Sequence, residues 1–246
     1  MRIIKINATN STNSFLKELA QNSSLDEITV AVTNNQTSGR GQMNNSWISE
    51  PYKNLTFSLF TTLKKVKVEH QAYLNFAVSL AIYDVLLEYD VPNLYIKWPN
   101  DIMSGKKKIC GILIENTFSH SRIKNTIIGI GLNVNQEKFH KNLTNASSLK
   151  IILKKSIELE ALMNTIINHI NLKISCVELK NFNQIYNRYH QALYKKGIPT
   201  TFLNQKTKQL FMGIINGVSS SGNLQIQLED KSIQEFGLKE VSFTKV

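Results

Sequence analysis

Gln36-Thr-Ser-Gly-Arg-Gly-Gln-Met-Asn-Asn-Ser-Trp47 is the stretch from which the rest of the chain can be interpreted. It follows a β-branched run, Ile28-Thr-Val-Ala-Val-Thr33, that is typical of a buried strand. Gly39 and Gly41 permit backbone conformations in which successive N–H groups face one concavity. Arg40 between them adds a planar charge that can hold a phosphate or carboxylate at two points. The stretch indicates a loop that covers a charged ligand, although Gly-Arg-Gly also occurs in ordinary turns.

Regular elements are expected on both sides of this loop. Upstream, Ile3–Ile6 is predicted as a short strand, and Ser11-Thr-Asn13 supplies capping side chains for a helix that runs to about Ala20. Downstream, the apolar pattern predicts further strands and two longer helices. The predicted strands span residues 55–60, 94–97, 108–115 and 126–133, and the helices span residues 69–88 and 159–177, the second continuing after a break towards residue 189.

The character of the chain changes after Gly197-Ile-Pro199. Short β segments follow one another, joined by tight turns such as Ser219-Ser-Ser-Gly222-Asn. Five such segments in about fifty residues predict a small β-barrel. The domain boundary is therefore expected near residue 192, with one domain over 1–192 and a second over 193–246.

Composition limits the class of protein. The chain has 246 residues, 42% of them hydrophobic, which is enough for a sizeable core. No apolar run is long enough to span a bilayer, and no signal peptide is recognisable at Met1. Cys110 and Cys176 are too few for a disulfide scaffold or a cysteine-based zinc site. We therefore expect a cytoplasmic protein that does not engage membranes.

The chain is strongly basic, with 29 Lys and Arg against 18 Asp and Glu, a formal charge of +11. Such an excess is compatible with nucleic acid, with an acidic protein partner or with phosphate-bearing ligands. A general bias in residue usage explains it equally well, because many of the lysines stand next to Asn and Ile.

Two further stretches carry polar side chains at strand ends. In Lys97-Trp-Pro-Asn-Asp101 the proline restricts the chain, and Asn100 and Asp101 project from a rigid turn. The strand Lys108-Ile-Cys-Gly-Ile-Leu-Ile-Glu115 begins with a lysine and contains Gly111, which predicts close approach of another group to the backbone. Alone, each stretch is also compatible with an ordinary turn or a solvated hairpin.

Several other functional classes have no support. Gly129-Ile-Gly-Leu-Asn133 lacks the third glycine and the following helix of a dinucleotide-binding fingerprint. Neither a Walker-type phosphate loop nor a Gly-x-Ser-x-Gly elbow is present. The five histidines show no metal-ligand spacing; they are His70, His120, His140, His169 and His190.

The order of these motifs along the chain resembles the biotin protein ligases. The resemblance covers essentially the whole chain and rests on Ser11-Thr-Asn13, Gln36-x-x-Gly-Arg-Gly with Trp47, Lys97-Trp-Pro-Asn-Asp101, Lys108–Glu115 and Gly129-x-Gly-x-Asn133. It implies an α+β fold: a mixed-sheet catalytic domain with packed helices, of the class II tRNA-synthetase-like/biotin ligase fold. It also implies that the C-terminal β unit is an SH3-like barrel.

The resemblance further implies a two-step reaction. Biotin and MgATP would give biotinyl-5′-AMP and pyrophosphate, and a lysine of a biotin carboxyl carrier domain would then attack that mixed anhydride. Cationic side chains and N–H groups are what such chemistry needs, because two anions must be brought together. The implied cofactors are ATP and Mg²⁺, and the implied partner is the carrier domain of a biotin-dependent carboxylase.

Carried over residue by residue, the resemblance assigns roles within this chain. Lys108 and Arg40 are implied as catalytic, and Asp101 as a metal ligand. The implied biotin-binding residues are Ser11, Thr12, Asn13, Gln36, Gly39, Arg40, Lys108 and Gly111. The implied ATP- and adenylate-binding residues are Arg40, Gly41, Gln42, Trp47, Asn100, Asp101, Lys108 and Asn133.

Two departures from the family pattern matter. Many members carry arginine directly after Gly-Arg-Gly, whereas here Gln42 stands there. Neutral glutamine cannot hold the charge of the adenylate, so we expect looser retention of the intermediate. Bifunctional members also carry a DNA-binding domain before the Ser-Thr-Asn motif, which begins here at residue 11. We therefore expect a monofunctional ligase that does not bind DNA.

Two alternatives remain open. Lipoate or octanoate ligases and transferases share the catalytic fold, but the Gly-Arg-Gly loop with Trp47 and the Lys97–Asp101 motif favour biotin. A nucleic-acid-binding protein is the second alternative, yet the aromatic residues of the C-terminal unit fit a barrel core better than a stacking surface. They are Phe202, Phe211, Phe236 and Phe243. A homodimer is compatible with the sequence but is not indicated by any exposed apolar stripe.

Overall fold

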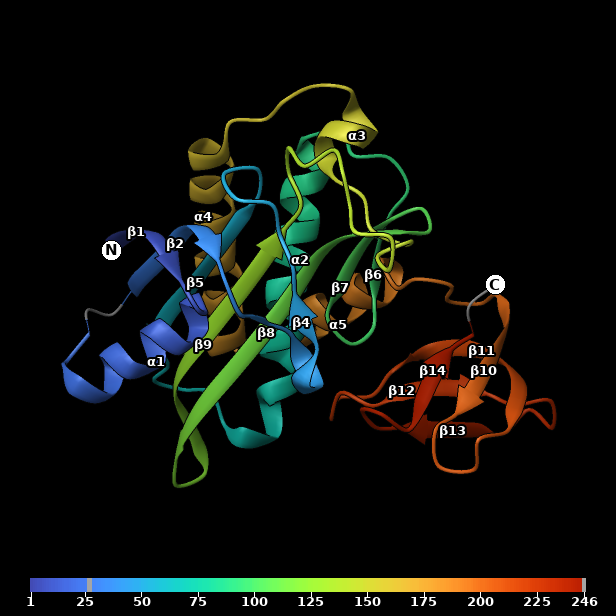
Figure 1. The fold of residues 1–246 in the computed structure, drawn as a ribbon. Coiled ribbons are helices and arrows are strands. Elements are labelled where there is room, and N and C mark those ends of the chain that lie inside the picture. The colour runs from blue at the N-terminus through green and yellow to red at the C-terminus, as the bar shows by residue number, and fades with distance from the viewer. Residues whose placement is uncertain (26–27, 245–246) are drawn as a thin grey trace.

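The computed structural model describes residues 1–25 and 28–244. Its larger part is built on a seven-stranded mixed sheet in the order β1-β2-β5-β9-β8-β7-β6 (Figure 1). β1 and β2 run parallel, and the other neighbouring pairs run antiparallel. The strands are β1 (Arg2–Thr9), β2 (Ile28–Gln36), β5 (Leu55–Thr62), β6 (Leu94–Lys97), β7 (Asp101–Ser104), β8 (Lys107–Ser119) and β9 (Arg122–Leu132).

Helices cover both faces of this sheet. α1 (Thr12–Asn22) packs on one face, where its Leu16 joins Phe60 of β5 in a small apolar cluster. α2 (Gln71–Glu88) and α4 (Leu159–Glu178) pack together against the other face, over Phe57 and Leu59. Because residues of both faces are covered, β5 is buried along almost its whole length. The short α3 (Leu149–Leu153) and α5 (Phe182–Gln191) complete the helical elements.

The predicted strands and helices around the sheet are confirmed. Ser11 caps α1 as expected, and its Oγ accepts a hydrogen bond from the Ser14 N–H at 3.4 Å. The break predicted in the last long helix separates α4 from α5. None of the helices in the described part of the chain is long and apolar enough to cross a membrane.

The glycine-rich stretch is not a plain loop. Gly39–Arg40 forms β3 and Ser46–Trp47 forms β4, which pair antiparallel across a 3₁₀ turn over Gln42–Asn44, with a second 3₁₀ turn over Val68–His70 preceding α2. Gly39 is required here because a Cβ on it would lie 2.2 Å from the Trp47 carbonyl oxygen. The expected loop is therefore a small hairpin, which we call the β3–β4 hairpin.

The C-terminal unit is a five-stranded antiparallel sheet in the order β13-β12-β11-β10-β14. Its strands are β10 (Pro199–Asn204), β11 (Leu210–Val218), β12 (Leu224–Gln227), β13 (Ile233–Phe236) and β14 (Val241–Phe243). Phe202 and Phe236 are buried in its core, with Phe211 between their rings. β13 and β14 are the outer strands of this order, so the pairing recorded for residues up to 244 does not close the predicted barrel.

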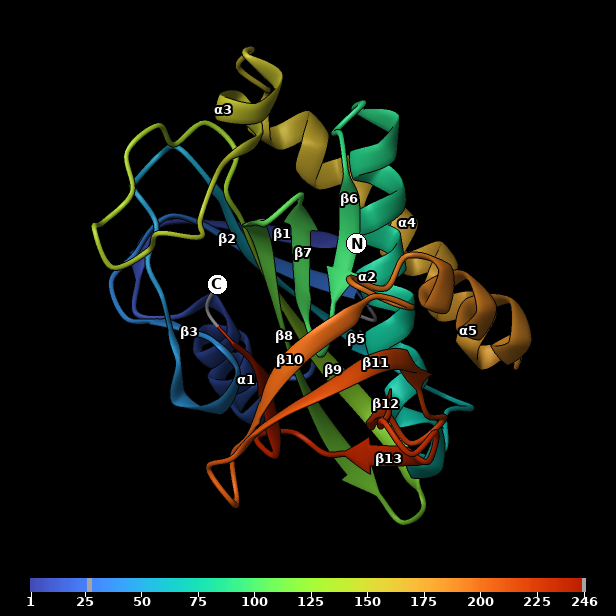
Figure 2. The same ribbon diagram turned by 90° about the vertical axis from the view of Figure 1, so that its right-hand side faces the viewer.

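The C-terminal sheet lies beside the β6 to β8 side of the larger sheet (Figures 1 and 2). The connecting segment hydrogen-bonds to both units: Tyr194 N donates to Ile96 O, and Gly197 N donates to Ile215 O. The backbone partner thus changes between residues 194 and 197. The boundary near residue 192 stays a prediction, a few residues before this change.

Candidate active site

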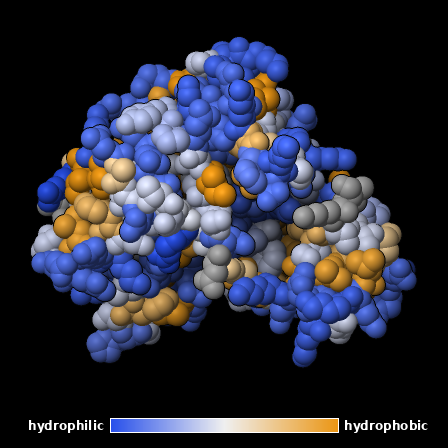
Figure 3. Space-filling model, viewed as in Figure 1, coloured by the Kyte–Doolittle hydropathy of each residue, from blue (hydrophilic) through white to orange (hydrophobic). Residues whose placement is uncertain are grey.

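A cavity of about 870 Å³ lies between the β3–β4 hairpin, strands β7 to β9 and the C-terminal sheet. Figure 3 shows the surface hollowed between the larger body and the C-terminal unit. Most of the residues singled out from the sequence line this cavity. They are Ser11, Thr12, Asn13, Gln36, Arg40, Gly41, Gln42, Trp47, Asn100, Asp101, Lys108 and Gly111.

The start of α1 gives the cavity a polar floor. Ser11, Thr12 and Asn13 are all buried, and Thr12 N donates to Gln36 Oε1 at 3.0 Å. The Thr12 hydroxyl hydrogen-bonds the hydroxyl of Ser58 at 2.6 Å. The end of β2 and the start of α1 are thereby joined through side chains, which places Gln36 next to the Ser-Thr-Asn motif.

Asn13 is held on three sides. Its Nδ2 donates to Glu115 Oε2 at 2.9 Å and to Leu113 O at 3.3 Å, and its Oδ1 accepts from the Ser58 hydroxyl at 2.5 Å. A Cβ on Gly129 would lie 2.2 Å from Asn13 Oδ1. The first glycine of Gly129-x-Gly therefore makes room for this amide. Ser58 was not singled out from the sequence, because a serine in an apolar strand carries no motif.

Trp47 packs against two neighbouring strands. Gly111 of β8 pairs with Gly131 of β9, so the two residues leave side-chain space on the same face of the sheet. A Cβ would lie 2.3 Å from the indole at Gly131 and 3.2 Å from it at Gly111. The close approach predicted at Gly111 is thus made by this chain's own Trp47, and also by the Lys108 side chain at 3.4 Å. The Trp47 Nε1 atom is buried and has no hydrogen-bond partner.

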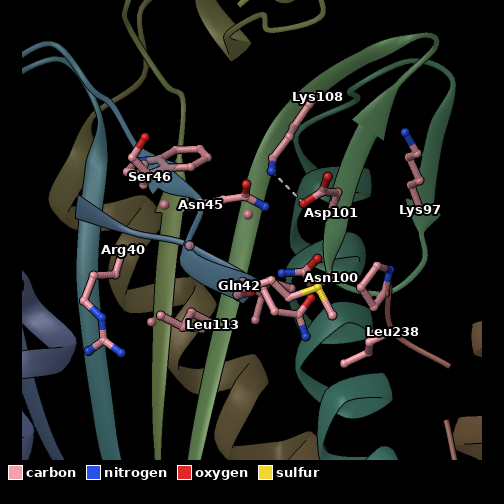
Figure 4. A pocket seen from close by; sticks show the side chains of 18 of the residues that line it. Arg40, Gln42, Asn45, Ser46, Lys97, Asn100, Asp101, Lys108, Leu113 and Leu238 are labelled. Carbon is pink, nitrogen blue, oxygen red and sulfur yellow. Dashed lines mark hydrogen bonds and ion pairs between the residues drawn. The ribbon is translucent and has the colours of Figure 1, made fainter. Parts of the chain in front are cut away.

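Lys108 and Asp101 form the charged end of the cavity. Lys108 Nζ lies 2.7 Å from Asp101 Oδ1, the contact drawn as a dashed line in Figure 4. The ammonium also lies 5.7 Å from the ring centroid of Trp47. Asp101 opens β7 and stands opposite Gly111 in the β7–β8 pair, so the sheet register brings the acid to the lysine. The structure thus brings the Lys97–Asp101 and Lys108–Glu115 motifs together, a contact that the sequence did not predict.

Two asparagine side chains fix the turn that carries Asp101, one from the turn itself and one from α2. Asn100 Nδ2 donates to Ile112 O at 2.6 Å, and Asn75 Nδ2 of α2 donates to Pro99 O at 2.9 Å. Asn100 lines the cavity, but its amide N–H₂ group already has a backbone partner. This residue therefore positions Asp101 as well as facing the cavity.

Lys97 is a second cationic residue of the cavity that the sequence analysis left without a role. Its Nζ lies 4.7 Å from the ring centroid of Phe243, a residue of the C-terminal sheet. Burial lowers the pKa of Lys97, an effect that Asp101 opposes and that Lys108 reinforces. A ligand with negative charge at this point would raise that pKa again and favour the charged form. The position of Lys97 at the start of the Lys97–Asp101 motif was the feature of the sequence that could have marked it as a site residue.

The C-terminal sheet forms one wall of the cavity. Among the side chains it contributes are Phe202, Gln205, Lys208, Leu238, Lys239 and Phe243. The wall is tied to the larger domain at Trp98, whose Nε1 donates to Gly222 O at 2.9 Å. Sequence motifs do not report this wall, because no local pattern says which face of a second sheet turns towards the first.

Arg40 points away from Lys108 and towards the floor of the cavity (Figure 4). Its Nη2 lies 2.9 Å from Glu115 Oε1, and its Nη1 donates to the Ser14 hydroxyl at 3.1 Å. Burial alone would raise the pKa of Glu115, but hydrogen bonds from Asn13 and Arg40 outweigh it and hold that pKa below its ordinary value. In the sequence Glu115 is the last residue of its motif, and no pattern there assigns it a role.

Two of the residues expected to touch ligand lie outside the cavity wall. Asn133 is buried, and its Nδ2 donates to Ser147 O at 3.0 Å, while its Oδ1 has no partner. Gly39 lies behind Gln36 and Trp47 in the β3–β4 hairpin. The ligand-binding role given to these two residues has no support from their positions, and each contributes instead to the backbone that carries the site.

Metal binding by protein side chains alone is not built into the site. Within residues 1–25 and 28–244, no group of three or more His, Cys, Asp or Glu side chains could hold a metal ion. Asp101 is the acidic residue among those that line the cavity in the described chain. One carboxylate suits Mg²⁺ when phosphate oxygens and water complete its octahedron. The donor set therefore fits a magnesium ion that arrives with a nucleotide.

Comparison with known proteins places the chain in a family. The sequence profile of the Biotin/lipoate A/B protein ligase family matches residues 6–133, more than half of the chain. The protein therefore belongs to that family, as its motifs predicted.

Characterised relatives match this same part. The chain is 35% identical over 127 residues to the bifunctional ligase/repressor BirA of Bacillus subtilis, covering 52% of this chain and 38% of that protein. It is 30% identical over 132 residues to the biotin–[acetyl-CoA-carboxylase] ligase of Mycobacterium tuberculosis, covering 52% of this chain and 47% of that protein. The matched part is thus less than half the length of these relatives.

A solved structure extends the likeness to the entire fold. The biotin protein ligase of Aquifex aeolicus, in complex with biotin and ATP, superposes with a TM-score of 0.81 at 24% identity. The superposition covers 100% of this chain and 99% of that one. The predicted α+β fold, with a mixed sheet, packed helices and a C-terminal β unit, is confirmed.

Proposed function

We propose that this protein is an ATP-dependent ligase that activates biotin as biotinyl-5′-AMP and transfers it to a lysine of a biotin carboxyl carrier domain. The observation that carries the proposal is the single cavity in which a hydrogen-bonding floor meets a cationic end. The floor is Ser11 to Asn13, and the cationic end is Lys108 with Lys97. A ligand with a neutral polar ring and a carboxylate fits such a cavity, with the ring at the floor and the carboxylate at the cationic end.

In the first step a biotin carboxylate oxygen attacks the α-phosphorus of ATP, and the bond from that phosphorus to the pyrophosphate oxygen breaks. Two anions must approach each other, so a fixed positive charge between them lowers the barrier. Lys108 is suited to this role because Asp101 and the ring of Trp47 limit where its ammonium can lie. Lys97 adds charge on the side of the C-terminal sheet.

In the second step the neutral amine of the carrier lysine attacks the acyl carbon. The bond from carbon to the AMP oxygen breaks, AMP leaves, and the nitrogen loses one proton. Water must be excluded meanwhile, because it competes for the same carbon. The β3–β4 hairpin and Trp47 cover this part of the cavity. Gln42, in the place where many relatives carry arginine, contributes no charge to retain the intermediate.

Mg²⁺, when bound, supplies positive charge to the phosphates of ATP, and Asp101 is the side chain that would hold it. Asp101 already pairs with Lys108, so the same carboxylate serves to position the lysine. The adenine ring is assigned to the neighbourhood of Trp47, and Asn100 to the nucleotide side of the cavity. We further place the protein in the cytoplasm, where ATP and the carrier domain are available.

The nearest rival is a lipoate or octanoate ligase or transferase, because the family includes such enzymes. The polar floor favours biotin, since hydrogen-bonding side chains left without partners would reject the apolar chain of an octanoyl group. A homodimer remains a further expectation, which light scattering during size-exclusion chromatography would test.

The test is pyrophosphate release with MgATP and either biotin or lipoate, followed by labelling of a carrier domain. We expect release and labelling with biotin, and for Lys108→Ala a loss of about 100-fold or more in rate, the usual cost of removing one charge-stabilising group. Lys106→Ala, at the exposed turn before β8, is the matched control and should leave the rate unchanged. Activity with lipoate alone would show that lipoate, not biotin, is the substrate, and inactivity with both would refute the proposal.

A further inference from the structure

Glu115 contacts two groups of the cavity without lining it. Its Oε2 accepts a hydrogen bond from Asn13 Nδ2 at 2.9 Å, and its Oε1 accepts one from Arg40 Nη2 at 2.9 Å. Lys17 on the same helix as Asn13 adds to the positive field around it. The carboxylate is therefore held ionised, and an ionised carboxylate can only accept hydrogen bonds.

This acceptor-only group sets the direction of a chain of hydrogen bonds. Asn13 must turn its N–H₂ group towards Glu115, so its Oδ1 faces Ser58. The Ser58 hydroxyl then donates to Asn13 Oδ1, which leaves the Thr12 hydroxyl as the donor to Ser58. The hydroxyl hydrogens of Thr12 and Ser58 and one hydrogen of the Asn13 amide thus point along the run towards Glu115.

The direction of this run decides what the cavity offers to a ligand. Both hydrogens of the Asn13 amide are used, by Glu115 and by Leu113 O, while Oδ1 keeps a lone pair. The Thr12 oxygen likewise keeps lone pairs once its hydrogen is given to Ser58. Asn13 and Thr12 both line the cavity, so the floor presents acceptors and selects a ligand with N–H donors. The ring of biotin, a cyclic urea, carries two such N–H groups.

The same carboxylate also anchors the β3–β4 hairpin. Arg40 is the residue of β3 that reaches Glu115, and its guanidinium also contacts Ser14 of α1. The ion pair is partly exposed, so its own contribution to stability is modest. Its geometric effect is larger, because one side chain joins the covering hairpin to the floor.

We propose that Glu115 is a positioning residue that makes the floor an acceptor surface for the N–H groups of a cyclic urea and ties the β3–β4 hairpin to it. This inference rests on the proposed function, because it names how that site recognises biotin. Glu115 touches no reacting atom, so its effect is exerted through Asn13 and Arg40.

The test compares biotin binding, measured calorimetrically without ATP, in the unmodified protein and in Glu115→Gln. Glutamine has the same shape but can donate, so Asn13 is no longer held in one orientation. We expect biotin affinity to fall by about 10-fold or more, as for loss of a hydrogen bond to a charged group. Glu18→Gln, an exposed glutamate on α1, is the matched control and should bind as the unmodified protein does.

A second ligand separates recognition from general damage to the fold. Biotin methylated on its ring nitrogens cannot donate, and the unmodified protein should prefer biotin over it strongly. Glu115→Gln should reduce that preference, whereas a merely structural role would weaken both ligands by the same factor. Thermal unfolding of each variant reports stability separately.

A reciprocal pair of substitutions tests the direction of the hydrogen bonds between residues 13 and 115. Asn13→Asp alone places two carboxylates in contact and should bind biotin poorly. Combined with Glu115→Gln, the donor and the acceptor exchange places, residue 13 again offers an acceptor, and biotin affinity should recover. Should Glu115→Gln fail to fold alone, the double variant carries the test, because the hydrogen bond between residues 13 and 115 is restored with its direction reversed, and only the bond to Leu113 O is lost. It must bind biotin and prefer it over the methylated form.

Unchanged biotin affinity in Glu115→Gln, or a double variant that folds without binding biotin, would overturn the inference. An unmodified protein that binds no biotin would instead refute the proposed function.

Discussion

Glycines set the positions of two side chains in this site. Gly129 leaves room for the Asn13 amide, and the pair Gly111 and Gly131 forms a shallow trough that receives Trp47. The sheet therefore lacks side chains where the floor and the hairpin must come close to its backbone. The glycines of Gly129-x-Gly, which lack the third glycine of a dinucleotide fingerprint, allow close packing within the chain instead.

Gly131→Ala tests this packing at the scale of one residue. A methyl group would lie 2.3 Å from the Trp47 ring, so the ring or the strand must move. We expect a loss of about 1–3 kcal/mol in stability, as for other overpacked sites, together with slower biotin-dependent pyrophosphate release. Chemical denaturation and the pyrophosphate assay measure the two effects.

A double-mutant cycle tests whether contact with the Trp47 ring causes the stability loss of Gly131→Ala. If the ring is what the methyl group strikes, adding Gly131→Ala to Trp47→Ala should cost little further stability. If the stability losses of Gly131→Ala and Trp47→Ala add in the double variant, the strand itself cannot tolerate alanine. Contact between the methyl group and Trp47 would then not explain the loss.

At the scale of elements, the two sheets are joined by a few specific contacts. Val218 N of β11 donates to His190 Nε2 of α5 at 3.0 Å, and a Cβ on Gly217 would lie 2.7 Å from the same imidazole. Trp98 makes the second link through Gly222. These contacts hold the C-terminal wall against the cavity, so their strength should affect the site as well as stability.

The His190 link predicts a dependence on pH. Burial lowers the pKa of His190, and nearby Lys196 adds to that effect. A hydrogen bond that the protonated ring can donate to Val218 O, 2.9 Å from Nε2, opposes it, and Tyr186 packs on the ring. The unfolded chain therefore takes up a proton first as pH falls below about 6.5, the ordinary value for histidine. Stability from this group is complete above that pH and declines as pH falls from there to the folded-state pKa.

Thermal unfolding between pH 7.5 and pH 5 measures this decline. His190→Gln, which cannot be protonated, should show a shallower dependence on pH than the unmodified protein. His120→Gln, at an exposed hairpin tip, is the control and should leave the slope unchanged. An identical slope for His190→Gln and the unmodified protein would mean that other groups govern the acid response.

At the scale of the whole molecule, the chain carries a charge of +11, and two units form its cavity. Lys208 and Lys239 bring positive charge to the cavity from the C-terminal sheet, and Lys97 does so from the larger sheet. An acidic carrier domain that docks over this opening would be attracted over several ångströms. In the proposed function biotin binds inside the cavity, where salt should screen its contacts less than those at the opening.

Salt should therefore affect the two substrates differently. Raising ionic strength from about 0.05 M to about 0.3 M shortens the screening length to below 10 Å, so the KM for the carrier should rise several-fold. The KM for biotin should change little. Lys239→Glu should raise the carrier KM and reduce its salt dependence, while Lys231→Glu, remote from the cavity, serves as the control. Equal salt dependence for both substrates would contradict electrostatic docking.

Much of the fold and site followed from local sequence. Backbone preferences of adjacent residues predict three features of the fold. They are Ser11 as a helix cap, the buried strand before Gln36 and the strand that begins near Lys108. The resemblance named Lys108 and Asp101 as site residues, whereas their ion pair is a finding of the structure. These features determined the family and most of the cavity lining.

Other features were decided only by the tertiary structure. The run from Thr12 through Ser58 and Asn13 to Glu115 joins residues about a hundred positions apart, and the wall around Phe243 comes from a separate sheet. Such contacts depend on strand register and on how two sheets face each other, which no local pattern encodes. The sequence by itself determined which chemical groups the site holds, and long-range packing decided which of them touch.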